Sequence, residues 1–253
     1  RACKCPGRSC PWSASTARSR VRASNASAAA TPTSARNAAR SYAFLVDRMV
    51  QLAFEISCTK LHPLATPTDS ERLALIAVGG YGRGEMAPYS DVDLLFLTPY
   101  KITPWAESVI ESTLYMLWDL HLKVGHASRT IRECLRLGRE DFTIRTALLE
   151  HRHLAGDAAL AEEIDQRLWA ELFSGTEAQF IEAKLKERET RHKRQGGQRY
   201  LLEPNVKEGK GGLRDLQTLY WIAKYVAQVG RTEDLMATGM IRESEMAAVR
   251  QAE

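Results

Sequence analysis

The sequence predicts an α+β protein, in which a small number of strands is flanked by helices and followed by a helical domain. Two short apolar runs separated by glycines, residues 73–78 and 91–97, are typical of buried strands. Longer segments on both sides place apolar residues at the three- and four-residue spacing of amphipathic helices. A hydrophobic content of 44% and a charged content of 26% over 253 residues fit an ordinary globular protein with one large domain or two small ones.

Residues 1–36 are predicted to be a disordered basic tail, because they contain too few large apolar side chains to offset the entropy of ordering. Their Arg- and Ser-rich composition is similar to that of an organellar transit peptide, and a wrong start or a shifted reading frame would also produce it. Eight basic and no acidic residues precede Asp47, so the rest of the chain carries a net charge of −4 against +4 for the whole. A basic nucleic-acid-binding face is therefore not expected on the folded part.

The five cysteines indicate a reducing compartment, because their number is odd and their spacing is not that of a disulfide framework. Cys3, Cys5 and Cys10 lie in the tail and lack an obvious fourth ligand for a structural zinc ion. The sequence contains no apolar run long enough to span a bilayer. We therefore expect a cytoplasmic protein that binds neither membranes nor nucleic acids.

The remaining elements follow from helical spacing and capping signals. An amphipathic helix is expected over residues 41–57. Thr103 and Pro104 open a helix that runs to about residue 120, because a Thr cap and a Pro in the first turn favour a helix start. A third strand is expected over residues 122–130, and further helices over residues 131–137, 141–153, 158–173 and 176–195. We place a catalytic domain at residues 37–155 and a helical domain, cut short at its C-terminal end, at residues 156–253.

The loop between the first two predicted strands contains more glycines than a tight turn requires. Glycines allow the backbone to approach a triphosphate closely and leave N–H groups available to donate. The spacing is neither that of a Walker loop nor that of a dinucleotide-binding fingerprint. The loop therefore predicts a phosphate site of another kind, and its glycines are Gly79, Gly80, Gly82 and Gly84.

Asp91 and Asp93 follow this loop on the second strand. Alternate residues of a strand point to the same face, so the two carboxylates are expected about 6–7 Å apart along it, where they repel each other. A divalent cation removes the conflict, and Mg²⁺ suits a site made of oxygen ligands and substrate phosphates. The pattern predicts Asp91 and Asp93 as metal ligands and catalytic residues of an enzyme that attacks a nucleoside triphosphate.

A second glycine-rich segment, residues 203–215, opens another apolar helix. Lys207, Lys210 and Arg214 lie among its glycines at the predicted helix start, which favours an anion site. We expect Lys207 and Arg214 to hold the triphosphate or the departing pyrophosphate.

Two strings carry a resemblance to a known family: Gly79-Gly-Tyr-Gly-Arg-Gly-Glu85 and Pro88-Tyr-Ser-Asp-Val-Asp93. Together they resemble the polymerase-β-type nucleotidyltransferases and, within them, the bacterial PII-protein uridylyltransferase / uridylyl-removing enzymes. The resemblance covers roughly residues 39–227 and includes the second glycine-rich segment. It implies a small mixed sheet flanked by helices, and it implies nucleotide contacts from Gly79, Gly80, Arg83, Ser90, Lys207 and Arg214.

The implied reaction is the Mg²⁺-dependent transfer of UMP from UTP to a tyrosine of PII, a signalling protein that reports nitrogen status. Full-length members of the family also carry an HD-type hydrolase domain and two ACT domains. This sequence has no His-Asp doublet, so we expect a fragment with at most the transferase half of the chemistry. Two alternatives stay open, namely a non-catalytic module that binds nucleotide or PII, and a nucleotidyltransferase of the same fold with another base or acceptor.

Many relatives in the superfamily carry a third carboxylate on a later strand. The corresponding position here falls near Gly125 and His126, where no acid is present. Either two carboxylates suffice, or Glu150 or Asp141 joins them, or His126 takes part as a base or a polar contact.

Overall fold

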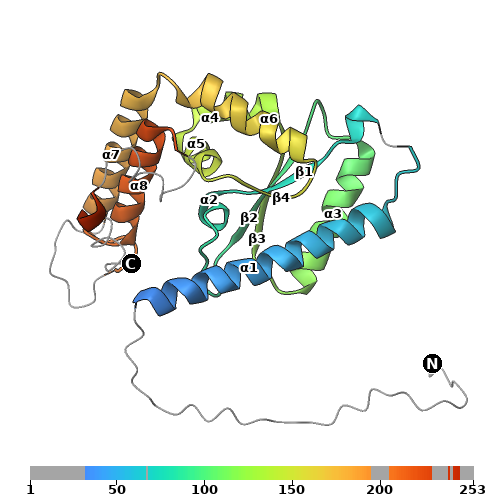
Figure 1. Cartoon of the computed structure of the whole chain (residues 1–253), viewed down its shortest axis with the longest axis horizontal. Helices are drawn as coiled ribbons and strands as arrows, with labels where there is room; N and C mark the ends of the chain where they lie inside the picture. The colour runs from blue at the N-terminus through green and yellow to red at the C-terminus, as the bar shows by residue number, and fades with distance from the viewer. Residues whose placement is uncertain (1–31, 67, 195–204, 230–238, 240–241, 246–253) are drawn as a thin grey trace, which may run out of the picture. The chain divides into compact units, whose positions relative to one another are not determined.

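The computed structural model describes residues 32–66, 68–194, 205–229, 239 and 242–245. The predicted mixed α/β architecture is confirmed, with a four-stranded sheet flanked by helices (Figure 1). The strand order is β3-β2-β1-β4, where β1 is antiparallel to β2 and β4, and β2 is parallel to β3. The strands are β1 (Ala74–Ala77), β2 (Val92–Thr98), β3 (Val124–Thr130) and β4 (Arg152–Gly156).

Two helices, α1 (Pro32–Ile56) and α3 (Pro104–Asp119), cover one face of the sheet (Figure 1). A π-helical turn, Ser57–Leu61, continues α1, and a 3₁₀ turn, Asp69–Glu71, precedes β1. Thr103 caps α3 as predicted, because its hydroxyl accepts the N–H of Ala106 at 3.2 Å. The apolar face of α1, including Val46, Val50 and Phe54, packs in one core with residues of β1 and β2.

The other face is covered by α4 (Ile131–Glu140), α5 (Phe142–Leu149) and α6 (Ala158–Leu168). A π-helical turn, Trp169–Phe173, leads to α7 (Glu177–Arg194), which lies beside α8 (Leu213–Ala227) in Figure 1. Phe180 of α7 stacks on Tyr225 of α8 with ring centroids 4.0 Å apart. Both rings belong to the same core cluster as Ile76 and Leu95 of the sheet. The later helices therefore pack on the core that the sheet begins.

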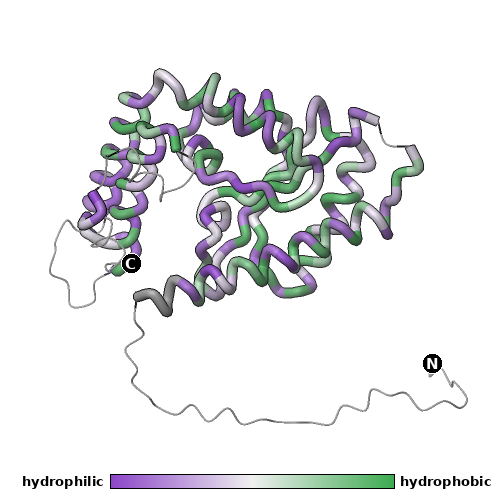
Figure 2. The backbone as a smooth tube through the Cα atoms, in the orientation of Figure 1, coloured by the Kyte–Doolittle hydropathy of each residue, from purple (hydrophilic) through white to green (hydrophobic). Residues whose placement is uncertain are grey.

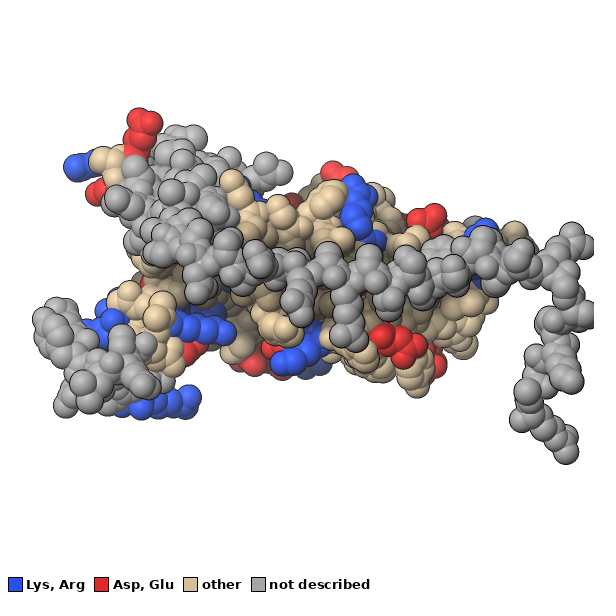
Figure 3. Space-filling view, turned by 90° about the horizontal axis from the view of Figure 1, so that it is seen from below, with Lys and Arg blue, Asp and Glu red and all other residues tan. Residues whose placement is uncertain are grey.

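Hydropathy follows this arrangement. Figure 2 shows the most apolar residues on the strands and on the helix faces that cover them, while α7 is mainly hydrophilic. On the face shown in Figure 3, basic and acidic side chains are interspersed wherever described residues are visible, so no basic stripe is seen there. Among the described residues, none of the helices has the length and apolar character needed to cross a membrane.

Two predicted boundaries are wrong. The expected helix over residues 141–153 ends at Leu149, and β4 follows it at Arg152–Gly156. Only Leu154 of this edge strand is buried, so its sequence does not show the apolar alternation that identifies a strand. In addition, α1 begins at Pro32, inside the segment predicted as a disordered tail, because proline is well suited to the first turn of a helix. Residues 1–31 lie outside the described part.

Candidate active site

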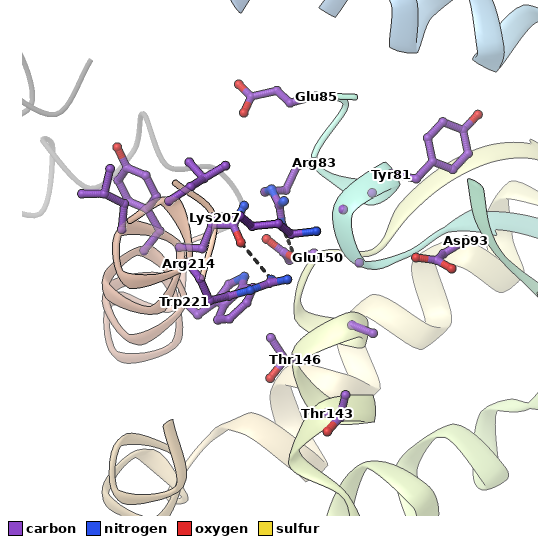
Figure 4. Close-up of a pocket in the computed structure, with 18 of the residues that line it drawn as sticks. Tyr81, Arg83, Glu85, Asp93, Thr143, Thr146, Glu150, Lys207, Arg214 and Trp221 are labelled. Carbon is purple, nitrogen blue, oxygen red and sulfur yellow. Dashed lines mark hydrogen bonds and ion pairs between the residues drawn. The ribbon is translucent and has the colours of Figure 1, made fainter. Parts of the chain in front are cut away.

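A cleft of about 2430 Å³ opens beside the end of β1 and the start of β2, where the two predicted motifs meet. Its walls come from α2 (Gly79–Gly82), the loop that leads to β2, α5, α7 and α8. Figure 4 shows Arg83, Glu150, Lys207 and Arg214 close together, with Asp93 on the far side of α2. The structure brings together in this cleft all the predicted site residues: Gly79, Gly80, Arg83, Ser90, Asp91, Asp93, Lys207 and Arg214.

The first glycine-rich segment forms a single helical turn, α2, directly after β1. Gly79 has a φ of +58°, a conformation that glycine adopts without strain, and the N–H of Gly82 donates to the carbonyl of Val78 at 3.1 Å. The first N–H groups of such a turn have no partner within it, so they are available to an anion. The sequence did not predict the helical form of this segment, and its phosphate-binding character stays a prediction.

Arg152 and Asp47 hold α2 in place, and sequence reasoning missed both. The Arg152 guanidinium donates to the carbonyls of Gly82 and Tyr81 at 3.1 and 3.2 Å, and to both carboxylate oxygens of Asp47 at 2.8 and 3.0 Å. The two charged residues come from β4 and α1, which are 105 positions apart in sequence. No local motif could have indicated this pair, because it forms only when the edge strand reaches α1.

The Asp93 carboxylate lies between two glycines. Asp93 of β2 pairs with Gly125 of β3, and a Cβ atom added at Gly125 would lie 2.6 Å from its Oδ1. A Cβ atom at Gly79 would lie 3.5 Å from its Oδ2. The backbone of the glycine turn and the neighbouring strand thus leave space around this carboxylate that side chains would otherwise fill.

The chemistry of Asp91 and Asp93 fits a divalent cation. Burial raises the pKa of the Asp93 carboxyl, and the negative charge of Asp91 raises it further. No lysine or arginine among the described residues forms an ion pair with either carboxylate, so their charge is not neutralised within that part of the chain. Carboxylate oxygens are the ligands that hard divalent cations prefer. The open space beside Asp93 and this unneutralised charge together fit a bound metal ion.

Neither of the two acids considered as a third carboxylate joins the pair, and His126, considered as a base or a polar contact, lies away from the cleft. Asp141 caps α5 by accepting the N–H of Thr143 at 2.6 Å. His126 packs edge-on against Trp118 of α3 and does not line the cleft. Glu150 lines the cleft but is paired with Arg83. Accordingly, the described residues contain no group of three or more His, Cys, Asp or Glu placed to hold a metal.

Arg83, which ends α2, extends into the cleft and donates to Glu150 at 2.6 Å. A Cβ atom at Gly80 would lie 3.7 Å from the Arg83 guanidinium, so the arginine side chain folds over the glycine turn. Gly82 packs against the backbone of Glu150 so closely that a Cβ atom there would be 1.7 Å from the Glu150 carbonyl oxygen. The end of α5 therefore supports both the turn and its arginine.

The second glycine-rich segment lies on the opposite wall. Lys207 and Arg214 face the cleft, whereas Lys210 is not among the residues that line it. The segment is folded back on itself, because the Arg214 N–H donates to the Lys207 carbonyl at 3.0 Å. Asp215 at the start of α8 accepts hydrogen bonds from the Gly211 N–H at 2.8 Å and from Arg191 and His192 of α7.

Comparison with known families agrees with this geometry. Residues 66–152 match the family described as Nucleotidyltransferase domain, and residues 179–253 match the family described as GlnD PII-uridylyltransferase. The first match contains the glycine turn and the aspartate pair, and the second contains the segment with Lys207 and Arg214. Nucleotidyltransferase domains typically use a divalent metal.

Three curated relatives, each named bifunctional uridylyltransferase/uridylyl-removing enzyme, align with most of this chain. The protein of Cereibacter sphaeroides is 66% identical over 224 residues, which make up 88% of this chain and 24% of that protein. The protein of Ruegeria pomeroyi is 64% identical over 222 residues, with shares of 88% and 24%. The protein of Erythrobacter litoralis is 55% identical over 212 residues, with shares of 84% and 23%. The chain thus spans about a quarter of the length of these relatives, and the resemblance noted from the sequence is confirmed.

Proposed function

We propose that this chain, which carries the nucleotidyltransferase domain of the GlnD PII-uridylyltransferase family, transfers UMP from UTP to a tyrosine of the PII signalling protein and releases pyrophosphate. The observation that carries the proposal is the Asp93 carboxylate, which lies beside Asp91 between two glycines and opens onto a cleft lined by cations. The names of the relatives support uridylyl transfer as the reaction.

Asp91 and Asp93 would hold Mg²⁺, because two carboxylates beside a phosphate-binding turn suit a cation that also takes substrate oxygens as ligands. When bound, Mg²⁺ supplies Lewis-acid stabilisation of the negative charge that develops during phosphoryl transfer. The two aspartates fix the place of the reaction at the start of β2.

The cleft residues would bind and orient the triphosphate. The N–H groups at the start of α2 lie near Asp93, because a Cβ atom at Gly79 would be 3.5 Å from its Oδ2. Ser90 directly precedes Asp91 in the sequence, and Arg83 extends from the other end of the turn. Lys207 and Arg214 would contact the triphosphate from the opposite wall. Several cations around one triphosphate hold it in line for attack and stabilise the charge on the leaving pyrophosphate.

In the proposed reaction the tyrosine oxygen of PII attacks the α-phosphorus of UTP. A bond forms between that oxygen and the α-phosphorus, and the bond from the α-phosphorus to the bridging oxygen of the β-phosphate breaks. The bridging oxygen leaves with the electron pair as part of pyrophosphate, and the tyrosine proton is released. The products are uridylylated PII and pyrophosphate, with Mg²⁺ unchanged.

We place this activity in the cytoplasm and expect neither nucleic acid nor membrane as a partner. Both described cysteines, Cys58 and Cys134, are free thiols, which is consistent with a reducing compartment. The interspersed charges on the face shown in Figure 3 also speak against a phosphate-backbone footprint there.

The experiment that tests the proposal offers four labelled nucleoside triphosphates, one at a time, to the chain together with Mg²⁺ and PII. We expect label to appear in PII from UTP and not from the other three, and we expect a chelator to abolish the signal. Label from another triphosphate would show that the enzyme uses a base other than uracil. Nucleotide binding without any transfer would instead identify a non-catalytic binding module.

A matched variant shows whether the transfer comes from this site or from a contaminating enzyme. Asp93→Asn keeps the size of the side chain but removes a charge that Mg²⁺ needs, so transfer should fall by at least about 100-fold, which is about 3 kcal/mol of transition-state stabilisation. Full transfer by the folded Asp93→Asn variant would contradict the assigned role.

A further inference from the structure

A small cluster of charges lies at the end of α5, between the two glycine-rich segments, and in it Glu150 is buried while Arg83 and Lys224 are half-buried. Glu150, whose side chain is only 5% exposed, pairs with Arg83 from α2. Lys224 of α8 donates from Nζ to the carbonyl of Leu149, one residue before Glu150, at 2.8 Å. Both cations line the cleft, although neither sequence motif includes Lys224.

Lys224 is a cation whose hydrogen-bonding capacity is only partly used. An ammonium group has three N–H donors, and among the described residues the Leu149 carbonyl is the one acceptor that Lys224 contacts. Burial lowers the pKa of the Lys224 ammonium, Glu150 counteracts this shift, and Arg83 adds to it. A half-buried cation with two remaining donors is stabilised when an anion enters the cleft.

The charges of the cluster also favour an anion. Arg83 and Lys224 contribute two positive charges beside Glu150, and Asp165, which pairs with His151, also acts on Lys224. The last carbonyls of a helix attract a cation such as Lys224. A phosphate group would accept the N–H groups of the two cations that have no acceptor among these contacts. Glu150 accepts from Arg83 and the adjacent Leu149 carbonyl accepts from Lys224, so two neighbouring residues position both cations.

We propose that Arg83 and Lys224 form one seat for the β- and γ-phosphates of the bound nucleotide, with Glu150 as a positioning residue that orients Arg83. The reacting α-phosphate belongs next to the aspartates, and Figure 4 shows the Arg83–Glu150 pair on the other side of α2 from Asp93. The seat therefore serves the part of the triphosphate that leaves as pyrophosphate. The inference rests on the proposed function, and it adds Lys224 to Arg214 as a residue of α8 that contacts the nucleotide.

The first test measures the binding of UTP and UMP, each with Mg²⁺, to the full chain and to Lys224→Met. Loss of a charge-assisted contact should weaken UTP binding about tenfold or more, while UMP binding stays within about twofold, because UMP lacks the phosphates that the seat contacts. Lys224→Arg restores the cation and should recover most of the affinity for UTP. Lys101→Met, at an exposed position outside the cleft, is the matched control and should change neither value.

The second test concerns Glu150 and uses a double-mutant cycle in the transfer reaction. Glu150→Gln should raise the KM for UTP several-fold with a smaller change in kcat, because Arg83 loses its orienting partner. Once Arg83→Gln is present, Glu150→Gln should add little further loss, since the two residues act as one unit. A purely structural role would lower thermal stability and give independent losses. Asp157→Asn, which removes the charge of a comparable arginine pair outside the cleft, is the control.

The outcomes separate this inference from the proposed function. If the wild-type chain binds no nucleoside triphosphate in the presence of Mg²⁺, the proposed function fails. If wild type binds UTP and the folded Lys224→Met variant binds it equally well, or loses UTP and UMP to the same extent, the phosphate seat is wrong while the proposed function stands. If Lys224→Met does not fold, Lys224→Arg and the Glu150 cycle decide the question.

Discussion

The proposed role of Asp93 as a metal ligand depends on two neighbouring glycines. Gly125 and Gly79 flank its carboxylate, and a Cβ atom at Gly125 would lie 2.6 Å from Oδ1. The superfamily position expected to supply a third acid falls at this glycine and its neighbour. With a carboxylate so close to the Gly125 backbone, a larger residue there would compete with Asp93 for space. The space is therefore open to the proposed metal ion and phosphates and is not filled by another side chain.

Gly125→Ala separates activity from stability. The added methyl group should displace the Asp93 carboxylate and lower the rate of transfer roughly 100-fold, since small misplacements of catalytic groups have effects of that size. Stability should remain within about 1 kcal/mol or increase, because alanine restricts the unfolded chain more than glycine does. Transfer assays and urea unfolding measure the two effects.

His126→Ala, at the next position, is the control for Gly125→Ala. Its side chain packs against Trp118 and lies outside the cleft, so transfer should be unchanged. A large loss of transfer in His126→Ala would revive a catalytic role for this histidine. Full activity of Gly125→Ala would show that the space beside Asp93 is not needed.

Asp157 provides a pH-dependent test of an ion pair at a distance from the cleft. Hydrogen bonds from Arg72, at 2.7 and 3.0 Å, hold the pKa of the Asp157 carboxyl below its usual range despite partial burial. A carboxyl group with a lowered folded-state pKa stabilises the protein above its unfolded pKa, and this stabilisation is lost as the pH falls through the folded pKa.

Asp157→Asn should therefore reduce the free energy of unfolding by about 0.5–1 kcal/mol at pH 7. The difference from wild type should shrink as the pH is lowered below about 4, where the wild-type carboxylate becomes protonated. Asparagine still caps α6, so the effect reports the charge. Urea unfolding at pH 7 and pH 3 makes the comparison, and a difference that does not depend on pH would argue against the Arg72 pair.

At the scale of elements, the sequence predicted the parts with strong local signals. The strands of the catalytic motif, the Thr103 cap and the amphipathic faces of the helices all follow from neighbouring residues. Strand β4 was missed because only one of its five residues is buried and its pairing partner β1 lies far away in the sequence. The contacts of Arg152 with Asp47, and of Lys224 with Leu149, were missed for the same reason.

Asp215 joins three elements at the second wall of the cleft. It accepts hydrogen bonds from Arg191 and His192 of α7 and from the Gly211 N–H of the loop, so it fixes the segment that carries Lys207 and Arg214. Asp215→Asn removes the charge that pairs with Arg191. We expect a loss of about 1–3 kcal/mol in the free energy of unfolding and about a tenfold rise in the KM for UTP, with a smaller change in kcat.

Asp119→Asn, at an exposed position near the end of α3, is the control for Asp215→Asn and should behave as wild type in both measurements. An unchanged KM for UTP in Asp215→Asn would show that the second glycine-rich segment does not contribute to nucleotide binding. A loss of stability alone would leave Asp215 with a structural role only.

At the scale of the described molecule, the cleft draws on segments that are far apart in the sequence. The aspartates come from the start of β2, Arg83 from the glycine turn, Lys207 from the segment before α8, and Arg214 from the first turn of α8. Each motif could be read from the sequence as an anion or metal site. Their meeting in one cleft could not, because it depends on the packing of α7 and α8 against the sheet core.

Hydrogen exchange tests this meeting of the two motifs. Addition of UTP with Mg²⁺ should slow amide exchange in residues 79–93 and in residues 205–227 together, because one ligand contacts both walls. Helix α3 contributes no residue to the cleft, so its amide exchange should be unaffected, which makes it an internal control. Protection confined to residues 79–93 would mean that the second segment does not contact the nucleotide.

The most direct test of the central claim is the calorimetric titration of Mg²⁺ into the chain with a non-hydrolysable UTP analogue, for wild type and Asp93→Asn. Loss of one ligand charge should weaken metal binding by about 100-fold in the variant, and the unfolding temperature should stay the same or rise because a half-buried charge has been removed. Equal Mg²⁺ affinity in a folded Asp93→Asn variant would contradict the assignment of this site.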